Sequence, residues 1–305
     1  MDNIYSKQVE LLLRVLPIIN KDKDFALKGG TAINFFVRDM PRLSVDIDLV
    51  YLPIKDRYET LNGITEKLKH IGESVRHKII TTNITEQKLK GTEYLGGLLI
   101  KNNDAVIKIE ANTVIRGSVY KPKIFSLCEK AQSKFEVFFK TRCLSIADLY
   151  GGKICAALDR QHPRDLYDVK LLLDNEGFSE EIRKAFLVYL ISHDRPIVEL
   201  LNPNQKDIGP IYEQEFEGMT DEKIDLKELN ITFDILVKTV NKSLTSLEKE
   251  FLLSFKQMRP DWALLNLENI GQMPSVKWKL KNLERMDKEK CETAIQKLAE
   301  HLSNI

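Results

Sequence analysis

Hydrophobic positions in the first half of the chain follow two periodicities. Apolar side chains recur at helical spacing over residues 5–19 and 58–71, which predicts two amphipathic helices. Gly72 is expected to end the second of them. Strand-like stretches lie at residues 25–27, 45–50, 75–82, 94–101 and 105–111. Helices and strands are therefore mixed in this half, which predicts an α+β domain over residues 1–178.

The second half of the chain has a different pattern. Residues 179–305 show little alternation and much helical periodicity. Residues 179–191 are expected to form a helix with Ile182, Phe186 and Leu190 on its apolar face, and Thr245 with Glu248 forms a capping box. We expect this half to be a separate helical bundle domain over residues 179–305.

Composition describes a globular protein without a strong overall charge. The chain has 305 residues, of which 43% are hydrophobic and 30% charged, with a net charge of +1. A role in nucleic-acid binding must therefore depend on local patches. Residues 101–142 contain nine basic and four acidic residues, which fits either a solvated surface or an RNA contact. Residues 196–234, with ten acidic and three basic residues, form an acidic surface or partner-facing segment.

Cysteine spacing and hydropathy indicate the cellular compartment in which the protein is expected. The four cysteines are scattered, with no C-x-x-C pair and no histidine at zinc spacing. The N-terminal apolar run contains charges and lacks a cleavage-site pattern, and no apolar run is long enough to span a bilayer. We expect a reduced, cytoplasmic protein that does not contact a membrane.

Candidate metal- and phosphate-binding residues are concentrated between Gly29 and Asp48. Strand alternation places Asp46 and Asp48 on one face, where two close carboxylates repel each other unless they hold a cation. Mg²⁺ prefers oxygen ligands and leaves positions open for substrate phosphates. Upstream, Gly29 and Gly30 allow the backbone to approach a phosphate closely. The combination predicts a site for a nucleoside triphosphate and its Mg²⁺.

These residues also carry a family resemblance. Gly29-Gly30-Thr31, fourteen further residues and then Asp46-Ile47-Asp48 resemble the G-[S/T]…D-x-D signature of the DNA polymerase β-like nucleotidyltransferases. With Arg42 and Ser44 included, the string resembles the AbiEii/AbiGii toxin branch of that superfamily. Thr31 stands where the wider superfamily usually has serine, and both side chains carry a hydroxyl.

The resemblance implies a fold, an activity and partners. The fold would be a polymerase β-like domain, with a mixed sheet flanked by helices, followed by an α-helical bundle. The activity would be transfer of a nucleotide from an NTP to an acceptor hydroxyl, with two Mg²⁺ ions. AbiEii-like toxins are GTP-binding proteins of abortive phage-infection systems, and related toxins add nucleotides to tRNA 3′ ends. RNA is therefore the expected acceptor, and a cognate antitoxin protein is a further candidate partner.

The resemblance also assigns roles to single residues. Gly29, Gly30, Thr31 and Ser44 would bind the phosphates, and Glu110 would be a third metal ligand beside Asp46 and Asp48, although Glu110 equally fits a solvent-facing strand end. Lys153 lies on the apolar stripe of a predicted helix, where a lysine must be paired, snorkel to solvent or face a polar cleft. The resemblance implies that it contacts the triphosphate. Asp165 and Asp168 share one helix face, and acidic residues are also favoured there by the helix dipole. In the family, a lysine and an aspartate spaced like Lys153 and Asp168 are both needed for activity, and Asp165 would take part in nucleotide binding.

Other functions stay open on these residues. The chain could be a nucleotide-binding or partner-binding protein on this scaffold without transferase activity, although an intact pair of aspartates argues against this. A small-molecule acceptor such as an aminoglycoside is compatible with the sequence. Glycosyltransferases also use D-x-D, but the Gly-Gly-Thr turn and the later lysine-bearing helix do not fit that class.

Overall fold

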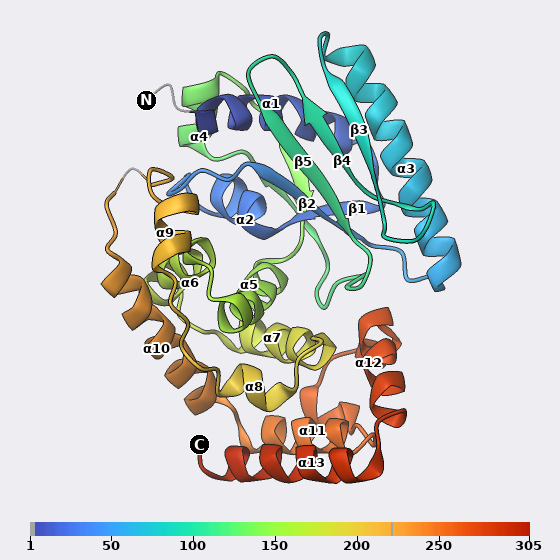
Figure 1. Ribbon diagram of the computed structural model, residues 1–305, viewed down its shortest axis with the longest axis vertical. Helices are drawn as coiled ribbons and strands as arrows, with labels where there is room; N and C mark the ends of the chain where they lie inside the picture. Colours follow the sequence, from blue (N-terminus) through green and yellow to red (C-terminus); the bar gives the residue numbers. More distant parts are fainter. Residues whose placement is uncertain (1–3, 221) are drawn as a thin grey trace. The chain divides into compact units, whose positions relative to one another are not determined.

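A computed structural model describes residues 4–220 and 222–305. The chain forms two compact units (Figure 1). The N-terminal unit comprises Met1–Ser145 and Gly218–Glu222, and the C-terminal unit comprises Ile146–Glu217 and Lys223–Ile305. The sequence predicted a division after residue 178, whereas the two units divide after Ser145.

The N-terminal unit is built on a mixed seven-stranded sheet, as the sequence resemblance implied. The strand order is β3-β4-β5-β2-β1-β7-β6. Strand β2 runs parallel to β5, and β1 runs parallel to β7, while the other neighbours are antiparallel. The strands are β1 (Phe25–Lys28), β2 (Asp46–Tyr51), β3 (Asn83–Lys88), β4 (Leu95–Lys101), β5 (Val106–Asn112), β6 (Lys123–Ser126) and β7 (Lys140–Cys143).

Helices cover the apolar face of this sheet. Both α1 and α3 contact the sheet and each other, and Figure 1 shows them beside strands β4 and β5. Their apolar stripes bury side chains such as Leu12 and Leu68 against inward-facing strand residues such as Ile47 and Ile109. The helices of this unit are α1 (Ile4–Ile19), α2 (Gly29–Ala32), the π-helical turn η1 (Ile33–Val37), α3 (Arg57–Lys78) and α4 (Glu129–Phe135).

One predicted strand is wrong. Residues 75–82 were expected to form a strand after a helix that ended at Gly72, but α3 continues through Gly72 to Lys78. Val75 lies four residues after Ile71 and is fully buried, so it extends the helical stripe. A Cβ added at Gly72 would lie 3.7 Å from side-chain atoms of Ile84 and Leu98, which is an ordinary van der Waals contact, so neither a turn nor close packing requires glycine here.

The C-terminal unit is helical throughout its described residues, as the periodicity predicted. Helices α5 and α7 pack so closely that a Cβ added at Gly151 would lie 2.8 Å from the backbone nitrogen of Phe186. This contact explains why α5 belongs with the bundle rather than with the sheet. The helices are α5 (Ile146–Arg160), α6 (Pro163–Asn175), α7 (Glu180–Ser192), α8 (Ile197–Leu201), α9 (Gly209–Glu215), α10 (Leu226–Ser243), α11 (Ser246–Lys256), η2 (Trp262–Leu265), η3 (Ile270–Gln272), α12 (Pro274–Glu284) and α13 (Lys288–Ser303).

The helices and the cysteines show two further properties of the described chain. Across residues 4–220 and 222–305, every helix is too short or too polar to cross a membrane. All four cysteines are free thiols, and burial raises the pKa of Cys128 to about 11.

Candidate active site

Charged side chains meet on one face of the sheet around strand β2. Within β2, Ile47 and Leu49 are buried, while Asp46 and Asp48 lie on the opposite, more accessible face. Strand β5 pairs in parallel with β2, so Asp46 lies beside Lys108 and Asp48 lies beside Glu110. Neighbouring residues in register project to the same side of a sheet. The predicted alternation is therefore present, and it brings three carboxylates onto one face.

The glycine turn adjoins this face at Asp48. Gly29 follows β1 with a φ of +72°, a conformation that favours glycine. A Cβ added there would lie 2.4 Å from Oδ2 of Asp48. At Gly30 an added Cβ would lie 2.6 Å from Nη2 of Arg42 and 3.0 Å from the Ser44 hydroxyl. Backbone conformation and this contact therefore both favour glycine at position 29, whereas a Cβ at Gly30 would require the Arg42 side chain to shift.

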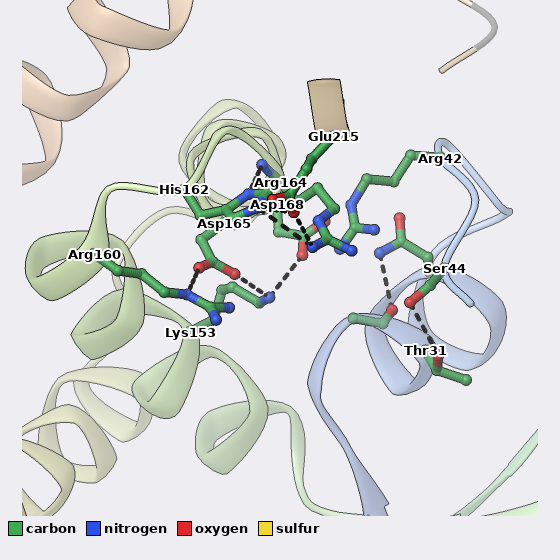
Figure 2. Close-up of polar contacts among 12 residues, drawn as sticks. Thr31, Arg42, Ser44, Lys153, Arg160, His162, Arg164, Asp165, Asp168 and Glu215 are labelled. Carbon is green, nitrogen blue, oxygen red and sulfur yellow. Dashed lines mark hydrogen bonds and ion pairs between the residues drawn. The ribbon is translucent and has the colours of Figure 1, made fainter. Parts of the chain in front are cut away.

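Thr31 ties the turn to the aspartate strand. Its side chain is only 1% exposed, and its hydroxyl donates to the carbonyl oxygen of Asp46 over 2.5 Å. The same hydroxyl lies 3.0 Å from that of Ser44, which is also buried (Figure 2). The hydroxyls that were predicted to bind phosphate are therefore engaged inside the protein.

Glu110 has a cationic neighbour on its own strand. The Lys108 ammonium lies 2.7 Å from the Glu110 carboxylate. This hydrogen bond raises the pKa of Lys108, and the charges of Asp46 and Asp48 act in the same direction. Lys108 is therefore a protonated cation on the face that carries the three carboxylates.

The aspartate pair fits a magnesium ion by its donor chemistry. Mg²⁺ in nucleotide enzymes is often held by one or two carboxylates together with substrate phosphates and water. Asp46 and Asp48 supply two carboxylates on one face beside the glycine turn. Within the described part of the chain, however, no group of three or more acidic, histidine or cysteine side chains is arranged to hold a metal. Asp46 and Asp48 are therefore the side chains that fit a metal together with substrate oxygens, and Glu110 stays a predicted third ligand.

The C-terminal unit holds the other predicted residues in one buried ion-pair network. Lys153 of α5 lies 2.7 Å from Asp165 and 3.0 Å from Asp168, both on α6. Its side chain is 7% exposed, so it does not snorkel to solvent. Arg160 adds a 2.6 Å contact to Asp165 (Figure 2). The network fastens α5 to α6.

Charge decides the protonation of Asp165. Burial alone would raise the pKa of its carboxyl, but the charges of Lys153 and Arg160 outweigh burial and hold that pKa well below its usual range.

At the start of α6, His162 and Arg164 both contact Glu215 of α9, at 3.0 and 3.1 Å. Burial lowers the pKa of His162 despite its hydrogen bond to Glu215.

Comparison with known families decides the relationship. Residues 10–281 match the model of the family described as nucleotidyl transferase AbiEii toxin, type IV toxin–antitoxin system. The chain belongs to the AbiEii nucleotidyl transferase toxin family. The sequence resemblance is thereby confirmed over most of the chain.

The fold of this AbiEii family member agrees with a solved toxin structure. The chain is similar to MenT4, a nucleotidyltransferase toxin from Mycobacterium tuberculosis H37Rv, with a TM-score of 0.61 and 13% identity. The similarity covers 92% of this chain and 93% of MenT4. At this identity the likeness confirms the predicted α+β fold and no more. No curated protein matches the chain.

Two cations of this AbiEii chain were missing from the predicted site. Arg42 was noted only as part of the motif, yet it is 3% exposed and lies against Gly30. Alternation along residues 105–111 puts Lys108 on the same face as Glu110, but the proximity of Lys108 to Asp46 depends on the register between β2 and β5. Strand alternation was the available signal for Lys108, whereas no spacing rule indicates the position of Arg42.

Proposed function

We propose that this AbiEii family protein transfers a nucleotide from an NTP to a hydroxyl at an RNA 3′ end, with tRNA as the expected acceptor. The observation that carries the proposal is the contact between the glycine turn and the aspartate pair. Gly29 abuts the Asp48 carboxylate, and Gly30 abuts the Arg42 guanidinium. Candidate metal ligands, a partly accessible glycine turn and a cation thus lie against each other in one unit.

In this proposal each side chain has a defined task. Asp46 and Asp48 hold one or two Mg²⁺ ions, and Glu110 is a further candidate ligand once its contact with Lys108 is released. Mg²⁺, when bound, neutralises phosphate charge and lowers the pKa of the attacking hydroxyl. The Gly29–Gly30 backbone and Arg42 receive phosphate oxygens, since planar guanidinium groups suit phosphate geometry.

The reaction itself needs little covalent participation by the protein. The acceptor oxygen forms a bond to the α-phosphorus, the bond from that phosphorus to the β-phosphate bridging oxygen breaks, and pyrophosphate leaves. The acceptor proton is lost to solvent or to a carboxylate. Positioning and charge neutralisation supply most of the acceleration in such reactions. Thr31 contributes by holding Asp46, and it does so without touching substrate.

The assignment of RNA as acceptor depends on the family and on local charge. Six basic residues of the 101–142 segment are exposed: Lys101, Lys121, Lys123, Lys130, Lys134 and Lys140. They lie in the N-terminal unit together with the aspartate pair. GTP as the preferred nucleotide, and a triphosphate contact by Lys153, stay predictions from the family resemblance. A cognate antitoxin is the partner expected of a type IV toxin–antitoxin family.

A labelling experiment tests the proposal. The protein is incubated with Mg²⁺, each α-labelled NTP in turn, and total RNA, protein or aminoglycosides as acceptor. We expect label on RNA, and none on RNA whose 3′-terminal diol has been oxidised with periodate. Asp48→Asn should abolish transfer, whereas Asp104→Asn, the same change at an exposed position of the same unit, should retain it. NTP binding without transfer to any acceptor would instead support a non-catalytic nucleotide-binding protein.

A further inference from the structure

A buried lysine in the C-terminal unit lacks a protein partner. Lys256, the last residue of α11, is 6% exposed. No hydrogen bond or ion pair to another described residue satisfies its ammonium group. Burial lowers the pKa of Lys256, and the nearby Cys291 thiol opposes this only as a lesser influence. The Lys256 nitrogen is not among the fully buried, unpaired side-chain atoms of the described residues, so its donors stay accessible to water or to a ligand.

Lys256 lines a pocket of about 160 Å³ between α11 and α12. Phe255, Leu283 and Met286 give the pocket apolar walls. A cavity of about 150 Å³ lined by apolar side chains is large enough for benzene. The pocket therefore has room for one small apolar body beside the ammonium group.

A second lysine of the pocket is already committed to the protein. The Lys279 ammonium donates to the carbonyl oxygens of His193, Asp194 and Arg195, which follow α7. These three contacts use the three donors of an ammonium group. Burial chiefly lowers the pKa of Lys279, and the positive charge of Lys256 lowers it further, so the two cations lie close enough to repel each other. Lys256 is therefore the lysine whose donors are available to a ligand.

The charges that line the pocket select a singly charged anion. Lys256 and Lys279 contribute two positive charges and Asp194 contributes one negative charge, which leaves +1. A monoanion would neutralise this net charge of +1, whereas a dianion would leave the pocket with a net charge of −1. A cationic ligand would face two ammonium groups. An anionic head on an apolar body matches both the charge and the walls.

We propose that this pocket binds a small organic monocarboxylate with an aromatic or branched body about the size of benzoate. The carboxylate accepts hydrogen bonds from Lys256, and the apolar body packs against Phe255, Leu283 and Met286. This binding site is separate from the aspartate pair and does not depend on the proposed transferase activity.

Calorimetric titration of the full chain tests the proposal with benzoate and its neutral analogue benzamide. We expect benzoate to bind at least about tenfold more tightly, because only benzoate forms a charge-assisted hydrogen bond with Lys256. Lys256→Met should abolish this preference. Lys277→Met, which removes an exposed charge from α12, should leave it unchanged. Equal affinity for both compounds, no binding of benzoate, or unchanged preference in Lys256→Met would each overturn the proposal.

A second measurement does not require a variant to fold. Thermal unfolding of the wild-type chain should shift upward with benzoate and not with equal concentrations of benzamide, benzylamine or inorganic phosphate, since a ligand of the native state stabilises it. An equal shift with phosphate would show a general anion effect and would contradict a site built for a carboxylate with an apolar body.

Discussion

The Thr31 hydroxyl donates a hydrogen bond to the backbone carbonyl of Asp46 over 2.5 Å. This bond joins the residue after the glycine pair to the first residue of β2. It fixes the start of the aspartate strand relative to the turn that Asp48 abuts. A side chain in the motif thus acts by positioning the backbone, and its hydroxyl is buried away from solvent.

Two substitutions of Thr31 test whether its hydroxyl group, rather than the shape of its side chain, positions Asp46. Thr31→Val leaves the Asp46 carbonyl without this donor, and we expect a loss of about 1–3 kcal/mol in the free energy of unfolding, with slower nucleotide transfer. Thr31→Ser keeps the hydroxyl and should restore most of both. Urea unfolding and initial transfer rates measure the effects. A defect in Thr31→Ser as large as that in Thr31→Val would show that the methyl group matters as much as the hydroxyl and would contradict this account.

Substitution of Gly29 tests the contact with Asp48. Gly29→Ala introduces a Cβ 2.4 Å from Oδ2 of Asp48, so the carboxylate must move. Gly91 is a matched control, because its φ is +73° and nothing lies within 4 Å of an added Cβ. Each alanine should cost about 1–2 kcal/mol of stability from the left-handed backbone alone.

Activity should distinguish these two glycine variants. Displacement of a metal ligand by about 1 Å can lower a rate on the order of a hundredfold. We therefore expect this loss in Gly29→Ala and nearly normal transfer in Gly91→Ala, measured at a temperature where both remain folded. Similar activity in the two variants would remove Asp48 from the proposed site.

Lys108 should weaken the binding of divalent cations. Its ammonium is paired with Glu110 and lies in register with Asp46, so a bound Mg²⁺ would be repelled by it. The side chain is 42% exposed, and solvent screening limits this repulsion to roughly 1 kcal/mol. Lys108→Gln should therefore lower the dissociation constant for Mg²⁺ or Mn²⁺ about fivefold, as measured by calorimetry or Mn²⁺ spectroscopy. Lys101→Gln, with the same change in net charge, should not, and a tightening in both variants would point to a non-specific charge effect.

The Lys153 network should make stability depend on acid pH. The pKa of Asp165 is lowered in the folded chain, whereas an unfolded aspartate has a pKa of about 3.9. Its stabilisation is therefore present above about pH 4 and is lost as pH falls through the folded pKa. Lys153→Met leaves two buried carboxylates short of a cation and should cost about 3–5 kcal/mol at pH 7.

A pH series and a partner variant complete this test. The gap in stability between wild type and Lys153→Met should narrow below about pH 4, because protonation of the aspartates removes the need for a cation. Arg160→Met should cost less, since the Arg160 side chain is 60% exposed. A gap that is independent of pH would show that Lys153 stabilises the unit by packing rather than by charge.

Local periodicity was sufficient for much of this fold. Alternation predicted that Asp46 and Asp48 share a face, and the capping box at Thr245 is present at the start of α11. Local periodicity gave a wrong prediction at residues 75–82, where β-branched and apolar residues suggested a strand. Val75 instead continues the buried face of α3, because burial against the sheet overrides local preference.

The site was less predictable because its contacts are not local. The pairing of Asp48 with Glu110 joins residues from strands that are far apart in sequence, and only the sheet register determines it. Sequence could not indicate that Lys108 would pair with Glu110, or that Lys153 would lie buried between two aspartates. The isolation of Lys256 depends on the packing of α11 and α12, to which spacing along the chain gives no guide.

The most direct test of nucleotide transfer by the aspartate pair compares an NTP labelled at the α-phosphate with the same NTP labelled at the γ-phosphate. Parallel reactions contain Mg²⁺, RNA and the same NTP, labelled either at the α- or the γ-phosphate. The proposed chemistry predicts that α-label joins the RNA and γ-label is released in pyrophosphate, and that both events stop in Asp46→Asn and Asp48→Asn. Transfer of γ-label to the acceptor, or α-label transfer that survives both substitutions, would contradict nucleotide transfer by the aspartate pair.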